Sequence, residues 1–226
     1  MKKSVFILLA FLIFNCSDDD TIDLTIFNEN LSVLQNLENG VAVLDITNTL
    51  GVEALYGLEY GGGFIYYVDE TDGTIMVAVD YSVIGATSWG DHFDLTNGAQ
   101  IGDGLDNTQQ IVDGNLNDNS SVTNGLEFGS DDYAFKIISD LVYENHNDWF
   151  IPSSGSMKAI FDNLHAQGLG DFDETIFYWT STKDGYQPYV MSFNSNLGGE
   201  SFLGSCFNSN STLIARKFKY IFFFFF

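Results

Sequence analysis

Apolar and polar residues along the middle of the chain predict a β-hairpin followed by a long loop region. Residues 64–68 and 74–79 are β-rich runs, and the turn-forming residues 69–73 separate them. Residues 80–130 are rich in Asp, Asn, Gly and Ser and show no sustained period. We therefore expect an extended folded loop to follow the hairpin.

Two later segments carry apolar residues at the helical spacing i, i+3, i+4 and i+7. They are residues 134–141 and 157–164, so each predicts an amphipathic helix. Ser153 or Ser154 can cap the second helix, because a hydroxyl accepts a bond from an unpaired N–H group. Gly168 is expected to end it.

Short apolar runs on both sides of these helices complete the expected fold. Residues 176–179, 189–193 and 216–221 read as strands separated by polar loops. Upstream, residues 31–58 contain two copies of Gly-Val-x-x-Leu, which predict two or three brief helices turning on glycine. The fold class is therefore α+β, with a hairpin, loops, two helices and then antiparallel strands.

The start of the chain predicts export. Residues 1–15 combine two lysines with an apolar run too short to span a bilayer, which is typical of a signal peptide. Cys16 follows directly and begins an acidic segment, residues 16–30. This arrangement resembles a lipoprotein signal, in which the Cys sulfur is lipidated, although Asn15 replaces the usual small residue. An ordinary signal peptide cut nearby is the alternative, and it would leave Cys16 as a thiol.

Two further features bear on the mature protein. Cys206 lies between apolar residues and is expected to be a small buried hydrophobe rather than a nucleophile. Residues 221–226 are a Phe-rich tail, which is either an artefact at a gene end or a buried last strand.

The net charge of the chain limits the classes of partner that it can bind. Eight Lys and Arg residues face 31 Asp and Glu residues, giving a formal net charge of −23. Such a surface repels nucleic acid phosphates and anionic lipid headgroups. We expect no nucleic acid partner, and contact with a membrane only through the lipid anchor at the outer membrane.

Six stretches, in order and spacing, resemble the Lcl C-terminal-like domain family over about residues 57–220. They are residues 62–69 with Gly73, 101–104 with 107–108, 148–153, 163–165 with 168–170, 178–182, and 215–218. The expected division of the chain is thus a signal peptide (1–15), an acidic tether (16–30), a short helical spacer (31–58), the domain (59–220) and the tail (221–226).

The resemblance implies a C-type-lectin-like fold, with two helices beside a small antiparallel sheet and long loops that display a binding surface. It implies adhesion or ligand recognition more than catalysis. The chain departs from the family where Ile137-Ile138 replaces a helix cysteine, where Leu213 replaces the first of two arginines, and where Tyr189 replaces tryptophan.

Most residues of these family-like stretches are expected to have structural roles. Trp149 and Trp179 are large anchors whose indole N–H needs one partner. Asp148 and Pro152 fit turn chemistry before a helix, and Arg216 is the retained arginine of the closing strand.

Catalytic and metal-binding patterns are weak in this sequence. The three histidines are scattered without zinc spacing, and no nucleophile elbow or phosphate-binding loop occurs. Calcium is the best cofactor candidate, because residues 113–119 alternate oxygen ligands like the start of a calcium loop. Asp118 and Asn124 depart from that pattern, and a solvated polar loop is the default.

A binding face is expected on the late loops, where aromatic rings and amides suit carbohydrate or protein recognition. The candidate residues are Tyr186, Gln187, Tyr189, Asn194, Asn196, Asn208 and Asn210. The same residue types also occur in any solvated loop. We expect a surface lipoprotein that binds an extracellular glycan or protein and is not an enzyme. The alternatives are a structural envelope protein and an enzyme on a formylglycine-generating-enzyme-like scaffold.

Overall fold

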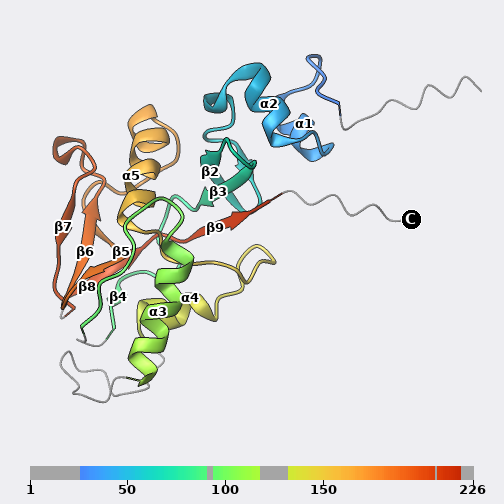
Figure 1. Cartoon of the computed structure of the whole chain (residues 1–226). Helices are drawn as coiled ribbons and strands as arrows, with labels where there is room; N and C mark the ends of the chain where they lie inside the picture. Colours follow the sequence, from blue (N-terminus) through green and yellow to red (C-terminus); the bar gives the residue numbers. More distant parts are fainter. Residues whose placement is uncertain (1–25, 91–93, 118–131, 207, 220–226) are drawn as a thin grey trace, which may run out of the picture.

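The computed structural model describes residues 26–90, 94–117, 132–206 and 208–219 (Figure 1). The fold is mixed α+β, as expected, and contains two sheets. The first has the order β1 (Glu59–Tyr60), β2 (Gly63–Asp69), β3 (Thr74–Ala78) and β9 (Ala215–Phe218). The second has the order β4 (Thr87–Ser88), β8 (Ser209–Thr212), β5 (Phe177–Asp184), β6 (Gln187–Ser192) and β7 (Ser201–Leu203). The strand pairs are antiparallel except β5 with β8, which is parallel.

The predicted hairpin is confirmed as β2 and β3. Its turn is held by Asp69, whose Oδ1 accepts hydrogen bonds from the backbone N–H and the hydroxyl of Thr71 at 2.9 and 2.6 Å. Strand β3 pairs with β2 on one edge and β9 on the other, and it is buried at every position because its side chains alternate between the two apolar clusters. The strands predicted at 176–179, 189–193 and 216–221 correspond to β5, β6 and β9.

The brief helices expected within residues 31–58 are also present. They are α1 (Val33–Glu38), α2 (Val43–Leu50) and the 3-10 turn η1 (Val52–Ala54). Gly40 and Gly51 make the turns with φ of +88° and +85°, a left-handed region in which a Cβ would be strained. The buried side chains of this spacer belong to the same apolar cluster as the hairpin, so the spacer packs onto the domain.

The expected loop over residues 80–130 is partly wrong, because α3 (Gly104–Asn117) lies within it. Its buried positions include Asn107, Thr108, Ile111, Val112 and Asn115, which follow helical spacing. Polar residues occupy part of this face, so apolar periodicity gave no signal. They are satisfied by hydrogen bonds: Asn107 donates to Gly98 O at 2.7 Å, and Thr108 Oγ1 accepts from Ile151 N at 3.1 Å.

Both predicted helices of the domain are present, as α4 (Ala134–Ser139) and α5 (Ser154–Asn163). Ser153 caps α5, since its Oγ accepts from Ser156 N at 3.2 Å. Gly168 does not end α5 itself; it ends the 3-10 turn η2 (His165–Gln167) that follows. A further 3-10 turn, η3 (Ser195–Leu197), connects β6 to β7.

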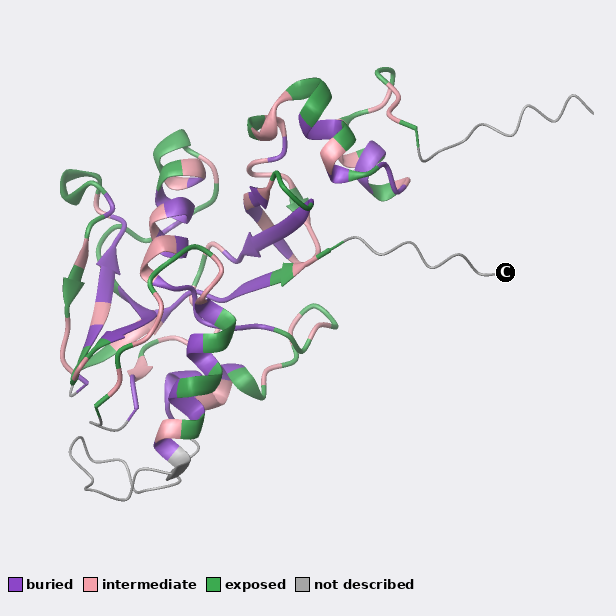
Figure 2. Ribbon diagram, in the orientation of Figure 1, coloured by how far each residue is buried: buried purple, intermediate pink, exposed green. Residues whose placement is uncertain are grey.

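Helix α5 packs against β2, β5 and β6 and so joins the two sheets. The buried apolar residues form two clusters. Figure 2 shows buried residues on strands of both sheets and on the helices. Four strands were not predicted, namely β1, β4, β7 and β8. They are two to four residues long, and β8 reads Ser-Asn-Ser-Thr, which has no apolar alternation.

Several sequence predictions lie outside the described residues. These are the signal peptide (1–15), Cys16 with the tether up to residue 25, and the Phe-rich tail (221–226). Within the described ranges, no helix is both long enough and apolar enough to cross a membrane.

Candidate functional site

The motif residue Arg216 is the centre of a buried clamp. Its Nε and Nη2 donate to the two carboxylate oxygens of Asp148 at 2.6 and 3.0 Å, and its Nη1 donates to Gly61 O at 2.6 Å. The guanidinium carbon also lies 5.6 Å from the centroid of the Trp149 ring and 4.8 Å from that of Phe218. These contacts tie β9 to the segment before α5 and to the start of β2.

The two motif tryptophans make structural hydrogen bonds. Trp149 Nε1 donates to Tyr143 O at 3.0 Å, and Trp179 Nε1 donates to Thr87 O at 2.9 Å. Pro152 is buried, and its carbonyl accepts from Ser181 N at 2.8 Å. The motif residues therefore contact the protein itself, and their arrangement fixes the segments around α5.

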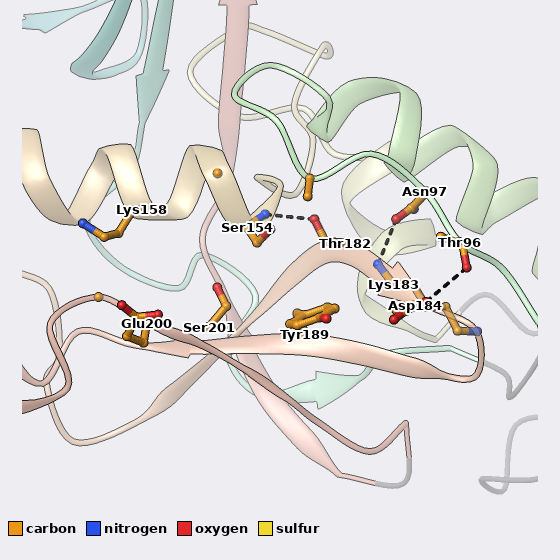
Figure 3. Close-up of a pocket in the computed structure, with 13 residues that line it drawn as sticks. Thr96, Asn97, Ser154, Lys158, Thr182, Lys183, Asp184, Tyr189, Glu200 and Ser201 are labelled. Atoms are coloured by element: carbon orange, nitrogen blue, oxygen red, sulfur yellow. Dashed lines mark hydrogen bonds between the residues drawn. The ribbon is translucent and has the colours of Figure 1, made fainter.

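Next to α5 lies an open cleft of about 570 Å³, which we call the Tyr189 cleft (Figure 3). It is lined by Thr96, Asn97, Ala99, Ser154, Gly155, Lys158, Thr182, Lys183, Asp184, Tyr189, Gly199, Glu200 and Ser201. The loop before α3 and the start of α5 form one wall, and β6 with the segment before β7 forms the other. In Figure 3 the half-buried ring of Tyr189 lies along β6 and faces the space below Ser154 and Thr182.

Hydrogen bonds hold the walls of the cleft in place. Asn97 Oδ1 accepts from Lys183 N at 2.8 Å, and Asn97 Nδ2 donates to Ser181 O at 3.0 Å. Thr182 Oγ1 donates to Gly98 O at 3.1 Å and accepts from Ser154 N at 3.0 Å. The cleft is therefore preformed, because β5, the loop and α5 are bonded to one another.

A close backbone approach explains one glycine of the lining. Gly155 N donates to Ala99 O at 2.9 Å, and a Cβ placed on Gly155 would lie only 2.4 Å from that oxygen. A residue with a side chain would push the loop away from α5. Glycine at this position therefore sets the width of the cleft.

Two lysines line the cleft but have partners of their own. Lys158 Nζ lies 2.5 Å from Asp162 Oδ1, one helical turn further along α5. The side chain of Lys183 is fully buried, and its Nζ lies 4.7 Å from the centroid of the Trp89 ring. Asp184 accepts a long hydrogen bond of 3.4 Å from Thr96 Oγ1, and Glu200 is exposed.

The structure does not gather the seven predicted binding residues into one site. Tyr189 lines the cleft, whereas Tyr186 and Gln187 are exposed at the turn between β5 and β6. Asn208 and Asn210 line a separate apolar groove of about 370 Å³, together with residues such as Phe177 and Phe202.

Asn194 and Asn196 belong to the η3 turn. Asn194 Oδ1 accepts from Asn196 N at 3.0 Å and from Asn196 Nδ2 at 3.1 Å, so both amides stabilise the turn itself.

Several lining residues were missed by the sequence reading, notably Ser154, Lys158, Asp184 and Glu200. Ser154 and Lys158 belong to α5, Asp184 ends β5 and Glu200 precedes β7, and none belongs to a motif with a functional spacing. Only the packing of α5 against β5 and β6 brings them together around the Tyr189 cleft.

The expected calcium loop is not present where the sequence placed its first ligands. The backbone of residues 113–117 instead forms the last turns of α3. Asn115 is buried there, and its Nδ2 donates to Ile111 O at 2.8 Å. Residues 118–119 and 124 lie outside the described ranges. Across the residues that are described, no group of three or more His, Cys, Asp or Glu side chains could hold a metal ion.

Cys206 is buried, as predicted, and its Sγ lies 3.7 Å from Tyr186 O.

No family model matches this sequence, and it has no significant match among curated proteins. The basis for a functional proposal is therefore the geometry of the cleft together with the export expected from residues 1–16.

Proposed function

We propose that this protein is an exported lipoprotein, attached to the outer membrane through Cys16, and that its domain binds a glycan outside the cell. The binding site is the Tyr189 cleft. The observation that carries the proposal is an aromatic ring on the wall of a preformed, open cleft whose lining residues are mostly of polar types. Recognition, rather than catalysis, is the function assigned to the cleft.

The chemistry of the cleft suits a sugar. The flat face of a tyrosine ring offers apolar contact to the C–H face of a pyranose at a low cost in conformational entropy. Hydroxyl and carboxylate groups around it, from Thr96, Ser154, Asp184 and Ser201, can bond to sugar hydroxyls. An open cleft also admits an internal segment of a long chain, which an enclosed cavity would not.

The proposal also includes the type of α+β architecture that the domain adopts. We assign a C-type-lectin-like architecture to residues 59–220, supported by the mixed α+β fold and by the long loops that form the cleft walls. The anchor rests on the sequence, in which an apolar run leads directly to Cys16 and an acidic segment.

The test of the site is binding of the purified protein to a glycan array, followed by titration of the best ligand. Tyr189→Ala should weaken binding at least tenfold, equivalent to about 1.4 kcal/mol. Tyr186→Ala is the matched control, because Tyr186 is 51% exposed and does not line the cleft. Undiminished binding by Tyr189→Ala would remove the cleft from the proposal.

The rival functions are distinguished when the same purified protein is tested on a glycan array and on a protein array. Binding to extracellular proteins but to no glycan would mean protein recognition, and binding to neither would favour a structural envelope protein. Turnover of a bound ligand would reinstate the enzyme hypothesis.

The anchor is tested independently. Mass spectrometry of the protein from its native membrane should find acyl chains on Cys16, and a Cys16→Ala form should be released from the membrane. An unacylated N-terminus in the wild-type protein would contradict the lipoprotein assignment and would leave the cleft unaffected.

A further inference from the structure

The charged groups that line the Tyr189 cleft are not balanced. Asp162 neutralises Lys158, which leaves the ammonium of Lys183, buried against Trp89, as a single positive charge in the lining. Asp184 and Glu200 are the two carboxylates of the lining, and both residues are exposed. The cleft therefore presents net negative charge to a ligand.

Among the described residues, no Lys, Arg or His side chain forms an ion pair with these carboxylates. The other Lys and Arg side chains of the described residues contact groups elsewhere: Lys136 pairs with Asp140, Arg216 with Asp148, Lys219 with Asp72, and Lys217 donates to Gly102 O. Within the described ranges, the Glu200 carboxylate has no ion-pair partner and Asp184 has only the hydroxyl of Thr96.

The aromatic ring lies between the two negative groups. In Figure 3, Glu200 stands at one end of the cleft, Asp184 at the other, and Tyr189 between them. The face of an aromatic ring carries partial negative charge and attracts cations, so ring and carboxylates favour the same kind of ligand group. The excess of acidic residues over the whole chain adds to this potential.

We infer that the glycan bound in the Tyr189 cleft is a polymer of amino sugars whose amino groups are free and protonated. The ammonium groups lie against Asp184, Glu200 and the face of Tyr189. This inference rests on the proposed function, and it adds the chemical class of the ligand. An anionic polysaccharide is disfavoured, because its carboxylates or sulfates would meet two carboxylates of the cleft.

The test compares two ligands that share a skeleton and differ in charge. A β-1,4-linked glucosamine tetrasaccharide and its fully N-acetylated counterpart are titrated into the full chain by calorimetry, in a mildly acidic buffer that keeps the amines protonated. The amino form should bind at least tenfold more tightly. The preference should weaken as salt is added, because both carboxylates are exposed and therefore screened.

Variants locate the origin of that preference. The double variant Asp184→Asn with Glu200→Gln should bind both tetrasaccharides equally. The matched control is Glu38→Gln with Glu70→Gln, which removes the same amount of charge at exposed positions outside the cleft lining. The control should keep the preference of the wild-type protein.

The outcomes separate this inference from the function on which it rests. Equal affinity for the two tetrasaccharides, or a preference that survives in the cleft variant, overturns the inference. If the protein binds other glycans through Tyr189 but does not bind the amino sugar, the inference is overturned and the proposed function stands. Binding to a pentalysine peptide as tight as to the amino sugar would assign the cleft to basic proteins and overturn both.

Discussion

The clamp around Arg216 permits a quantitative test of how this fold is held together. The Arg216 side chain is 8% exposed, whereas that of Asp148 is 45% exposed, so the two members of the pair lose different amounts when they are separated. We consider Asp148→Ala and Arg216→Met, of which the second keeps the apolar stem and removes the charge.

Asp148→Ala should be the more damaging change. It leaves a buried guanidinium with Gly61 O as its one remaining acceptor in the clamp. Breaking a buried ion pair costs about 3–5 kcal/mol, and we expect a smaller cost of about 2–3 kcal/mol because Asp148 is half exposed. Arg216→Met should cost about 1–2 kcal/mol, because water can solvate the remaining carboxylate while the contacts with Trp149 and Phe218 are weakened.

The double variant should be about 2 kcal/mol less destabilised than the sum of the single changes, because it strands no charge. The assay is equilibrium unfolding in urea, followed by tryptophan fluorescence, with Trp149 reporting next to the clamp. Asp162→Ala, which breaks the exposed Lys158 pair, is the control and should cost about 0.5 kcal/mol or less. Strict additivity of the two changes, or a cost as small as that of the control, would refute the reasoning.

Three further predictions concern the cleft wall, a helix cap and pH. Gly155→Ala should destabilise the protein by about 1–3 kcal/mol and weaken glycan binding, measured by unfolding and titration, because its Cβ would meet Ala99 O. Ser153→Ala should cost about 1–2 kcal/mol in urea unfolding, since it removes the cap of α5 and a 2.6 Å bond to Gln100 O. Hydrogen bonds from Lys219 and then Thr74 lower the pKa of Asp72 from 3.8 to about 2. Asp72 therefore stabilises the fold above about pH 4, and this contribution is lost as the pH falls through about 2. Acid unfolding of Asp72→Asn should lack that component; an unchanged pH profile would contradict it.

Local sequence patterns determined the elements that form within short windows. The hairpin of β2 and β3, the spacer helices and α5 were predicted because apolar spacing, turn residues and caps act over a few neighbouring residues. The buried state of Cys206 followed from its apolar neighbours in the same way.

Helix α3 shows where this reasoning fails. Its buried face contains Asn107, Thr108 and Asn115, and the sequence read as a polar loop. Asn107 and Thr108 can be buried because tertiary partners, Gly98 O and Ile151 N, form hydrogen bonds with them, and Asn115 donates to Ile111 O in its own helix. Because residues 113–117 belong to this helix, they do not form the start of the expected calcium loop.

Acidity and the α+β class could be read from the sequence by itself, because each depends on composition or on local spacing, whereas export stays a prediction from residues 1–16. The Tyr189 cleft could not be read from it, since its wall depends on bonds such as that from Lys183 N to Asn97 Oδ1, which joins residues 86 positions apart. Glu200, Asp184 and Tyr189 likewise come from three separate segments. Only the packing of α5 and the loop against β5 and β6 decides which side chains share a hollow, because contacts between distant segments leave no period in the sequence.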